Sequence, residues 1–561
     1  MVMSRSSIAY FSMEIGLESH IPTYSGGLGV LAGDTLRAAA DAGLNMVAVT
    51  LLFRKGHFRQ RVDAQGQQYE EPESWPVEEY LEELPGRAVV AIEGRDVLLR
   101  AWKHEIVGIN GDRVPVFFLD TDLEANAEQD RGITDQLYQG DERHRLVQEV
   151  VLGMGGIRML RALGYKEIAR YHMNEGHAAL LSLELLAEQV GGSEISDAHV
   201  EAVRARCAFT THTPVQAAHD SFPRSLVESV LGESSVLWEK EADFCCNGTL
   251  DLTLLALHNS DYINGVAKRH GEVSRAMYGE YRVDSITNGV HAAFWASGPI
   301  AELLDGYIPD WRSDNIGLRG AVGIPSDEIS AAHLKNKRRL LHHVRERSGV
   351  NMEEHVLTLG FARRFTAYKR PALFFSDLDR LRAIVRHAGP LQVVFSGKAH
   401  PRDEPGKELI REVFRAAEAL RDNLRVAFLE DYDIDQGRLI TAGVDVWLNT
   451  PQPPMEASGT SGMKAALNGV PSFSVLDGWW VEGCIEGVTG WSIGERPPDN
   501  DMTQEEVSSQ LYTKLENVIM PLYYNDEQEF SDIRRYAISL NGSFFNTERM
   551  IQEYIAKAYF R

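Results

Sequence analysis

The sequence predicts an α/β fold built from two doubly wound domains that face a cleft. Three observations lead to this prediction: the chain has 561 residues, short apolar runs rich in β-branched residues alternate with longer helical patterns, and these runs fall into two groups. A chain of this length exceeds what one hydrophobic core usually supports. Continuous apolar runs, each followed by a helical stretch, are typical of parallel strands that are buried on both faces.

The first group of strands lies before about residue 290 and includes the runs NMVAVTLLF and RVPVFFLD. We therefore expect an N-terminal α/β domain over residues 1–290. A long amphipathic helix is expected next, in IPSDEISAAHLKNKRRLLHHVRERSGV. Its predicted cap is Ser326 with Asp327, and Gly349 is its predicted end.

The second group of strands runs from His355 to about Val475 and comprises HVLTLGFA, LQVVFSG, LRVAFLE and VDVWLN. It predicts a C-terminal α/β domain over residues 291–561. The last segment, DIRRYAISLNGSFFNTERMIQEYIAKAYF, has helical patterning, and we expect it to return to the first domain. Ligands of doubly wound sheets bind beyond the carboxyl ends of the strands, so candidate site residues should follow strands.

Composition and charge exclude several classes of function. The formal net charge is −24 and the pI about 5.2, which argues against nucleic acid as a partner because binding its phosphate backbone needs a basic surface. No secretory signal is recognisable, and no apolar stretch reaches the roughly 18 residues of a membrane span. We therefore expect a cytoplasmic protein with no membrane partner. The four cysteines form neither a disulfide framework nor a metal motif.

Residues 453–483, PPMEASGTSGMKAALNGVPSFSVLDGWWVEG, carry the sharpest signal. Small residues from Ala457 to Gly462 precede a helix that we expect to open near Met463, with Lys464 in its first turn. Such a loop lets backbone N–H groups approach an anion at the helix N-terminus. Lys464 is then either a surface lysine on a capped helix or a Schiff-base lysine beside an anion site. The spacing does not fit a Walker loop.

A second cluster of candidates is basic. Arg363, Arg364, Lys369 and Arg370 follow the predicted strand HVLTLGFA. They either form a solvated basic surface or bind phosphate, and the residues alone do not decide between the two. Histidines also gather in MNEGH and THTPVQAAH, but the HExxH spacing of a zinc site is absent, so no metal is predicted.

These motifs resemble those of the α-glucan phosphorylase family, which contains the glycogen, starch and maltodextrin phosphorylases. EASGTSGMK resembles that family's EASGTGNMK, whose lysine carries pyridoxal phosphate, and YSGGLGVLAGD resembles its NGGLGRLA loop. INGVAKRH and ITNG resemble NGVARIH and TNG, and FARRFTAYKRP resembles VKRIHEYKRQ. SGKAHP resembles GGKAAP, and SVLDGWWVE resembles TLDGANVE. The segments occur in the family's order, from about Tyr10 to about Glu482.

The resemblance implies a fold, a cofactor and a phosphate site. The fold would be two Rossmann-like domains of the GT-B glycosyltransferase type, with the glucosyl and acceptor side in the first domain and the phosphate side in the second. The cofactor would be pyridoxal 5′-phosphate. The residues that would hold it are Lys464, by a covalent bond, with Arg363, Tyr368 and the backbone of Thr460 and Ser461. Arg364 and Lys369 match the ligands of the substrate phosphate.

The resemblance also implies residues that bind the sugar. The positions that match glucose contacts are His270, Asn288, Glu456, Ser458 and Gly459, and His270 would also steady charge in the transition state. The loop Gly26, Gly27 and Leu28 would close over glucose and phosphate, with glycine allowing positive φ and close backbone approach. His212 is a candidate for the acceptor subsite.

The implied reaction is reversible phosphorolysis of terminal α-1,4-glucosidic linkages, with catalysis by Lys464, Arg364, Lys369 and His270. It would give glucose 1-phosphate with retention from inorganic phosphate and an α-glucan or another oligosaccharide. The YFSMEIG segment begins at residue 10, so we expect a short form without the N-terminal regulatory region of the long enzymes. A homodimer is compatible with the resemblance.

Some alternatives stay open. The acceptor could be a different small glycoside, and a nucleotide-sugar glycosyltransferase of the same fold or a non-catalytic relative would share part of the pattern. The sequence also departs from the family's motifs at Thr366 and Ala367, and at Ser461 and Gly462, where the long enzymes have Gly-Asn.

Overall fold

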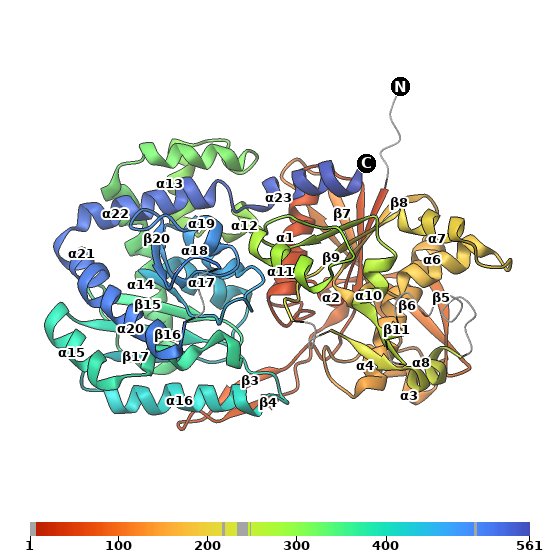
Figure 1. Cartoon of the computed structure of the whole chain (residues 1–561), viewed down its shortest axis with the longest axis horizontal. Coiled ribbons are helices and arrows are strands. Elements are labelled where there is room, and N and C mark those ends of the chain that lie inside the picture. The colour runs from red at the N-terminus through yellow and green to blue at the C-terminus, as the bar shows by residue number, and fades with distance from the viewer. Residues whose placement is uncertain (1–6, 216–218, 233–244, 247, 499–501, 561) are drawn as a thin grey trace.

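The computed structural model describes residues 7–215, 219–232, 245–246, 248–498 and 502–560. Two large sheets lie in separate halves of the molecule (Figure 1). Both consist mostly of parallel strands with helices on each face, so the predicted α/β class is confirmed. Within the described ranges, no helix is long and apolar enough to cross a membrane.

The first sheet has nine strands in the order β14-β13-β9-β8-β1-β2-β7-β6-β5. All neighbours from β14 to β7 are parallel, whereas β6 and β5 extend the edge as an antiparallel hairpin. Chain order reverses at β1, which lies between β8 and β2, so a crevice for ligands is expected at the carboxyl ends of β1 and β8. The strands are β1 Ser7–Ser12, β2 Met46–Leu51, β5 Glu82–Ile92, β6 Arg95–Val107, β7 Arg113–Asp120, β8 Ile168–Asn174, β9 Cys207–Thr210, β13 Tyr262–Gly265 and β14 Val283–Ser285.

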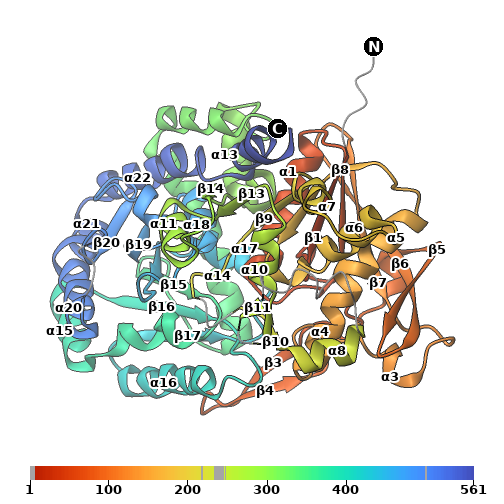
Figure 2. The same ribbon diagram turned by 45° about the vertical axis from the view of Figure 1, so that its right-hand side comes forward.

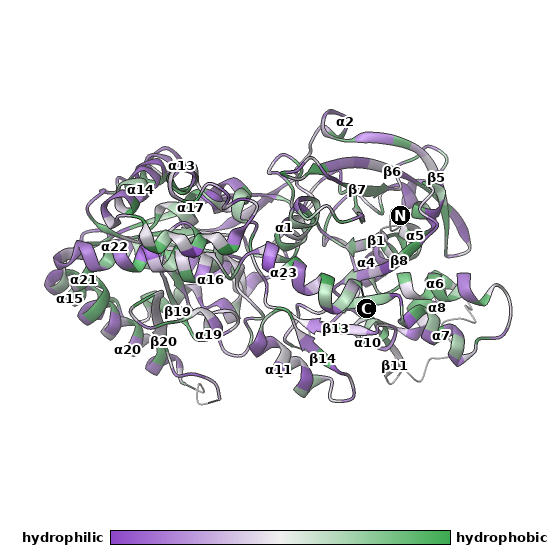
Figure 3. Cartoon of the chain, turned by 90° about the horizontal axis from the view of Figure 1, so that it is seen from above, coloured by the Kyte–Doolittle hydropathy of each residue, from purple (hydrophilic) through white to green (hydrophobic). Residues whose placement is uncertain are grey.

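Helices cover both faces of this sheet because each presents an apolar side to it. Side chains of α1 (Gly27–Asp41) pack in a core on one face. The other face packs against a larger set of helices: α4 Glu142–Val150, η1 Val151–Gly155, α5 Gly156–Ala162, α6 Leu181–Val190, α7 Asp197–Arg204, α8 Arg224–Leu231 and α10 Leu252–His258. Seen from above, helices of both halves show green on one side and purple on the other, as amphipathic helices should (Figure 3).

The second sheet has six parallel strands in the order β17-β16-β15-β18-β19-β20. The reversal of chain order lies between β15 and β18, where a doubly wound sheet binds its ligands. All four runs predicted as strands of the second group are found in it. The strands are β15 Leu357–Ala362, β16 Leu391–Ser396, β17 Arg425–Leu429, β18 Val446–Asn449, β19 Ser472–Val475 and β20 Gly490–Ile493.

The helices of the second half again cover both faces of their sheet. One face packs on α15 Leu378–Ala388, α16 Glu404–Leu420, α20 Gln504–Lys514, α21 Met520–Asn525 and α22 Glu527–Tyr536. The other packs on α14 Ser326–Ser348, α17 Ile434–Gly443 and α18 Thr460–Leu467.

The long predicted helix is α14, and it ends as predicted at Gly349, whose φ is 71°. Its predicted cap is wrong. Pro325 occupies the cap position, and Ser326 is the first helical residue. The Ser326 hydroxyl donates to Asp532 on α22 at 2.6 Å, so tertiary packing takes the hydroxyl that a cap would need.

The chain crosses between the halves in three places. The end of the first half continues through α11 Lys268–Met277, α12 Ala292–Trp295, α13 Gly298–Tyr307 and η5 Asn315–Gly323 to α14. The last helices, α23 Thr547–Tyr554 and η10 Ile555–Tyr559, pack beside α1 on the first sheet (Figures 1 and 2). A two-stranded arm, β3 Arg59–Val62 with β4 Gln68–Glu71, reaches from the first half to the second near α16. Further short elements include α2 Val77–Tyr80, α3 Glu128–Arg131, β10 Ser221–Pro223, β11 Cys245–Cys246, β12 Thr249–Asp251 and α19 Trp480–Gly483.

Candidate active site

Lys464 lies on α18, which follows β18 at the carboxyl edge of the second sheet. The helix begins at Thr460 and not near Met463 as predicted, because Gly459 adopts φ 91° and caps it. Only a glycine takes this left-handed conformation readily. Lys464 therefore lies in the second turn of α18, not the first, and Thr460 and Ser461 supply the first backbone N–H groups, which have no intrahelical partner.

The Lys464 amine is buried against an aromatic ring, and a carboxylate acts on its charge. Its side chain is 5% exposed, and Nζ lies 3.7 Å from the centroid of the Trp295 ring. Burial lowers the Lys464 pKa to about 8, with Asp34 opposing the shift. Trp295 Nε1 donates to Asp34 Oδ2 at 2.7 Å, so α1 of the first half reaches this site. An amine with a pKa this near neutrality, in an apolar enclosure, suits a lysine that attacks a carbonyl group.

Two of the cations that follow β15 meet one carboxylate from the loop after β18. Glu456 accepts from Lys369 Nζ at 2.6 and 2.8 Å and pairs with Arg363 Nη2 at 2.8 Å. Burial alone would raise the pKa of Glu456, but Arg363 and Lys369 outweigh it and lower the pKa to about 2. Arg363 also donates to Asn449 at the end of β18. The structure thus groups Glu456 with Arg363 and Lys369.

Arg364, between these two cations in the sequence, is exposed and does not contact Glu456. Among the described residues, no carboxylate forms an ion pair with Arg364; Tyr368 is its hydrogen-bonding neighbour, and Glu14 attracts its charge. Burial would raise the pKa of Tyr368, but Lys369 and Arg364 lower it. Lys369 Nζ also lies 4.6 Å from the Tyr368 ring. An exposed arginine next to a second cation provides a place for an anion in a chain whose net charge is −24.

Three of the predicted sugar-binding residues carry buried polar atoms without partners. These atoms are His270 Nε2, Asn288 Oδ1 and Ser458 Oγ, on residues that are 1%, 3% and 4% exposed. His270 Nδ1 accepts from the backbone N–H of Val266 at 3.1 Å, which places the ring proton on Nε2. Burial lowers the His270 pKa to about 4, so the ring is neutral at pH 7. Buried polar atoms in native proteins usually have partners, and a polar ligand bound here would supply partners for all three.

The predicted glycine loop caps α1 at the carboxyl end of β1. Glu14 holds it, with Oε2 accepting from the backbone N–H of Ser25 at 2.5 Å and of Gly26 at 3.1 Å. The expected reason for its glycines is wrong in one respect, since Gly26 has φ −160° and no residue of Gly26, Gly27 and Leu28 has positive φ. Close approach holds instead at Gly29, where a Cβ would lie 2.7 Å from Glu14 Oε2.

The other candidate histidines lie beyond β8 and β9 or within β8. His212 Nε2 bonds Asn174 Oδ1 at 2.7 Å, and its backbone N–H donates to Glu175 Oε2 at 2.7 Å. His172 bonds the hydroxyls of Tyr559 and Thr210 and braces the fold. No group of three or more His, Cys, Asp or Glu side chains in the described ranges could hold a metal ion.

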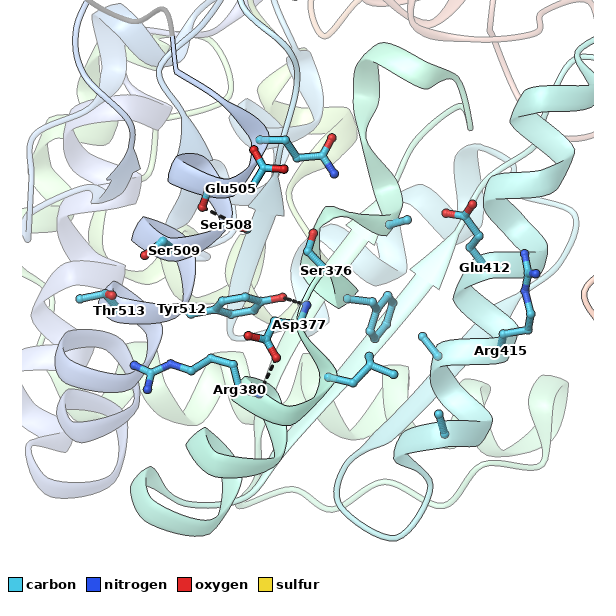
Figure 4. Close-up of a pocket in the computed structure, with 16 residues that line it drawn as sticks. Ser376, Asp377, Arg380, Glu412, Arg415, Glu505, Ser508, Ser509, Tyr512 and Thr513 are labelled. Atoms are coloured by element: carbon cyan, nitrogen blue, oxygen red, sulfur yellow. Dashed lines mark hydrogen bonds between the residues drawn. The ribbon is translucent and has the colours of Figure 1, made fainter.

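A separate hollow of about 960 Å³ lies between α15, α16 and α20 (Figure 4). It contains none of the predicted site residues. Tyr512, which lines it, accepts from the backbone N–H of Asp377 at 2.9 Å and donates to the Phe374 carbonyl at 3.0 Å. Its hydroxyl is thus already satisfied, and the hollow lacks the orphaned polar atoms found at the carboxyl edges of the sheets.

Comparison with known proteins agrees with this geometry. Residues 233–489 match a family model described as carbohydrate phosphorylase. The maltodextrin phosphorylase of Thermococcus litoralis is 39% identical over 98% of this chain and 70% of its own length. The chain belongs to the carbohydrate phosphorylase family. The family resemblance predicted from the motifs is therefore confirmed.

Two further relatives are aligned with this chain over different shares of their own length. The glycogen phosphorylase of Aquifex aeolicus is 33% identical over 99% of this chain and 86% of its own length. An uncharacterized protein of Methanocaldococcus jannaschii is 30% identical over 98% of this chain and 99% of its own length. The alignments thus extend over nearly the whole chain, including both sheets.

Two residues of the candidate site were not predicted. Trp295 follows the predicted TNG motif by only a few residues, and Asp34 ends the predicted glycine-loop motif. An aspartate inside an apolar helix and a tryptophan close to a matched motif were the available signals. Neither predicts a contact with Lys464, because that contact arises only when α1 and α12 pack over α18.

Proposed function

We propose that this phosphorylase catalyses the reversible phosphorolysis of terminal α-1,4-glucosidic linkages in α-glucans. Inorganic phosphate would take up the glucosyl unit with retention, giving glucose 1-phosphate and a shortened glucan. The names of the relatives, maltodextrin phosphorylase and glycogen phosphorylase, support this substrate class. The observation that carries the proposal is the buried Lys464 amine on the same sheet edge as Arg363, Arg364 and Lys369.

Pyridoxal 5′-phosphate is the cofactor that the residues fit. Lys464 supplies an amine of lowered pKa whose Nζ has no hydrogen-bond acceptor among the described residues. Arg363 has a buried Nε without a partner, and the start of α18 offers free N–H groups to a phosphate. Lys464 would hold the group covalently, while Arg363, Tyr368, Thr460 and Ser461 would line it. When bound, the cofactor would supply a phosphate group that exchanges a proton with the substrate phosphate.

The chain's own residues would bind and orient the two substrates. Arg364 and Lys369 hold the attacking phosphate and offset its charge, with Arg364 free of any carboxylate partner in the described part of the chain. Lys369 must then share its charge between Glu456 and phosphate. The neutral His270 donates from Nε2 to a sugar hydroxyl, and Asn288 and Ser458 bond the others. The loop of Gly26, Gly27 and Leu28 excludes water when the site is filled.

We also propose a GT-B arrangement with one domain over residues 1–290 and the other over 291–561. Support comes from the separate cores around the two sheets and from the site residues at the carboxyl edge of each. The packing of α23 beside α1 means that the end of the second domain would brace the first.

Two alternative functions predict different results. A phosphorylase for another small glycoside would release sugar 1-phosphate from that glycoside but not from maltodextrin. A nucleotide-sugar glycosyltransferase would hold no covalent pyridoxal on Lys464, and the relatives' names do not favour it. The acceptor beyond the first glucosyl units and assembly as a homodimer stay proposals.

The deciding experiment uses the full chain incubated with pyridoxal phosphate. Maltodextrin and inorganic phosphate should yield glucose 1-phosphate, and borohydride followed by peptide mapping should label Lys464. Lys464→Ala should lose the label and nearly all turnover. Turnover undiminished in Lys464→Ala would show that the catalytic assignment is wrong, and a panel of small glycosides would identify a different acceptor.

A further inference from the structure

The β3–β4 arm extends from the first half and grips a loop of the second half (Figures 1 and 2). That loop is residues 396–400, Ser-Gly-Lys-Ala-His, which begins at the last residue of β16. The arm makes this contact through two amide side chains, Gln60 on β3 and Gln68 on β4, which we call the central amides; glutamine is usually exposed in proteins. Gln60 is 0% exposed and Gln68 is 2% exposed.

Every polar atom of these two amides has a partner. Gln60 Nε2 donates to the Gly397 carbonyl at 2.9 Å and to Gln68 Oε1 at 2.8 Å, and Gln60 Oε1 accepts from the Asp431 N–H at 2.8 Å. Gln68 Oε1 accepts from the Ala399 N–H at 3.0 Å, and its Nε2 donates to the Ala399 carbonyl at 2.9 Å. Gln68 Nε2 also donates to Glu70 at 2.7 Å. A fully satisfied buried network of this type fixes geometry more strongly than apolar contacts do.

The loop of residues 396–400 in turn bonds to the backbone of residues 363–365, which carry the arginines of the site. The Ser396 carbonyl accepts from the Arg363 N–H at 3.1 Å, and the Lys398 carbonyl accepts from the Phe365 N–H at 2.9 Å. Gly397 has φ 144°, and a Cβ there would lie 2.0 Å from the Arg363 carbonyl oxygen. The backbone on both sides of Arg364 is therefore attached to the loop that the amides hold. A shift of that loop would move the arginines.

Ion pairs surround this contact but do not define it. Arg61 pairs with Glu430 at 3.0 Å, and Lys407 pairs with Glu70 at 3.1 Å. Arg61 is 43% exposed, and exposed pairs contribute little and hold no fixed geometry. Lys407 is 8% exposed, but its partner Glu70 also accepts from Gln68, so this pair belongs to the amide network. The buried amides are thus the part of the arm that can set position.

We propose that Gln60 and Gln68 are positioning residues for the phosphate subsite. They act from the first half of the molecule through residues 396–400 on Arg363 and Arg364, and so make phosphate binding depend on how the two halves sit together. This inference rests on the proposed function, since it takes Arg364 as a phosphate ligand. Misplacement of a substrate-binding group by about 1 Å can cost up to roughly a hundredfold in rate, which sets the scale of effect to look for.

The test compares Gln60→Met and Gln68→Met with Gln65→Met, an exposed glutamine at the tip of the same arm. Methionine keeps the volume and length of glutamine but removes its hydrogen bonds. We expect the KM for inorganic phosphate to rise about tenfold in the two central variants, with the KM for maltodextrin within about twofold of wild type. Gln65→Met should match wild type in both.

A purely structural role would give a different pattern. If the central variants lose kcat alone, raise both KM values equally, or keep the wild-type KM for phosphate, the inference is wrong. Should the methionine variants not fold, Gln60→Asn keeps the amide and withdraws it by one methylene, and it should still raise the KM for phosphate selectively.

A binding measurement separates this inference from the proposed reaction. Inorganic phosphate is titrated into each protein by calorimetry without any glucan. If the wild type binds phosphate but does not cleave maltodextrin, the proposed glucan activity fails, while about tenfold weaker phosphate binding by the central variants would still support their role. Wild type and variants of equal phosphate affinity would overturn it, as would a wild type that binds no phosphate.

Discussion

At the residue scale, the Lys464 amine lies against the Trp295 ring and senses the Asp34 carboxylate. The motif around Lys464 predicts a cofactor-bearing lysine through resemblance, but it carries no information on pKa. That property comes from burial by α1 and α12, which are more than 160 residues away in the chain. Orphaned atoms such as His270 Nε2 likewise become visible only when the surrounding residues are packed.

The pH dependence of pyridoxal attachment follows from the Lys464 pKa of about 8. Below that pH the amine is protonated and not nucleophilic, so the attachment rate should rise about tenfold per pH unit and then level off above about pH 8. An ordinary lysine, with a pKa near 10.4, would keep gaining rate for about two more units. The rate is measured as borohydride-trapped label on Lys464 over time.

Asp34 provides the matched control for this prediction. Its carboxylate opposes the lowering of the Lys464 pKa, so Asp34→Asn should move the plateau to lower pH. A rate that still climbs between pH 9 and 10 in the wild type would contradict the assignment.

At the scale of elements, strands were predictable where they are continuous and apolar, as β15 and β16 are. β13 and β14 have only four and three residues, too few for a pattern to be recognised. The start of α18 was misplaced because the conformation of Gly459 depends on its packing beside Glu456 and Trp479.

The departure of this chain from the family at Gly462 has a packing reason. A Cβ at Gly462 would lie 2.8 Å from Trp479 Cζ2 and 3.1 Å from Ser472 Oγ. The family's motifs have Asn at the position of Gly462 and Ala at the position of Trp479. In this chain a small residue on α18 therefore accompanies a large one after β19. Trp479 fills that space and packs 4.8 Å from the Phe545 ring centroid.

This exchange predicts a non-additive pair of substitutions. Gly462→Asn alone should destabilise by about 1–3 kcal/mol through overpacking, and Trp479→Ala alone by about 3–5 kcal/mol through a cavity. The double variant should be more stable than the sum of the two losses predicts, by about 0.5–3 kcal/mol, as coupled neighbours are. Urea unfolding of all four proteins measures this. Strict additivity would show that the two positions do not share the space.

At the scale of the whole molecule, the two halves are joined by contacts that local sequence patterns do not predict. Gln60 and Gln68 are residues normally found at the surface, so their burial under the second half could not be predicted from the sequence. The return of the last helix was expected from its patterning. Its anchoring point was not, because it consists of backbone contacts between residues 289–290 and 545–547.

This anchoring point leads to a test of how the halves depend on each other. Val290 N–H donates to the Phe545 carbonyl at 3.1 Å, and Thr547 N–H donates to the Val290 carbonyl at 3.1 Å. A Cβ at Gly289 would lie 2.2 Å from the backbone of Asn546. Backbone atoms held on both sides cannot move aside as a flexible side chain can, so Gly289→Ala should cost about 3 kcal/mol, the upper end of ordinary overpacking.

The same substitution should impair the site, because Arg549 on α23 donates to the Asn288 carbonyl at 3.0 Å and Asn288 adjoins Gly289. We expect a lower urea midpoint together with a raised KM for maltodextrin. Gly306→Ala is the control, since nothing lies within 4 Å of its Cβ position and it is in α13. It should gain up to about 1 kcal/mol from helix propensity and leave the KM unchanged. If Gly289→Ala unfolds at the wild-type midpoint, α23 does not anchor the first half through this contact.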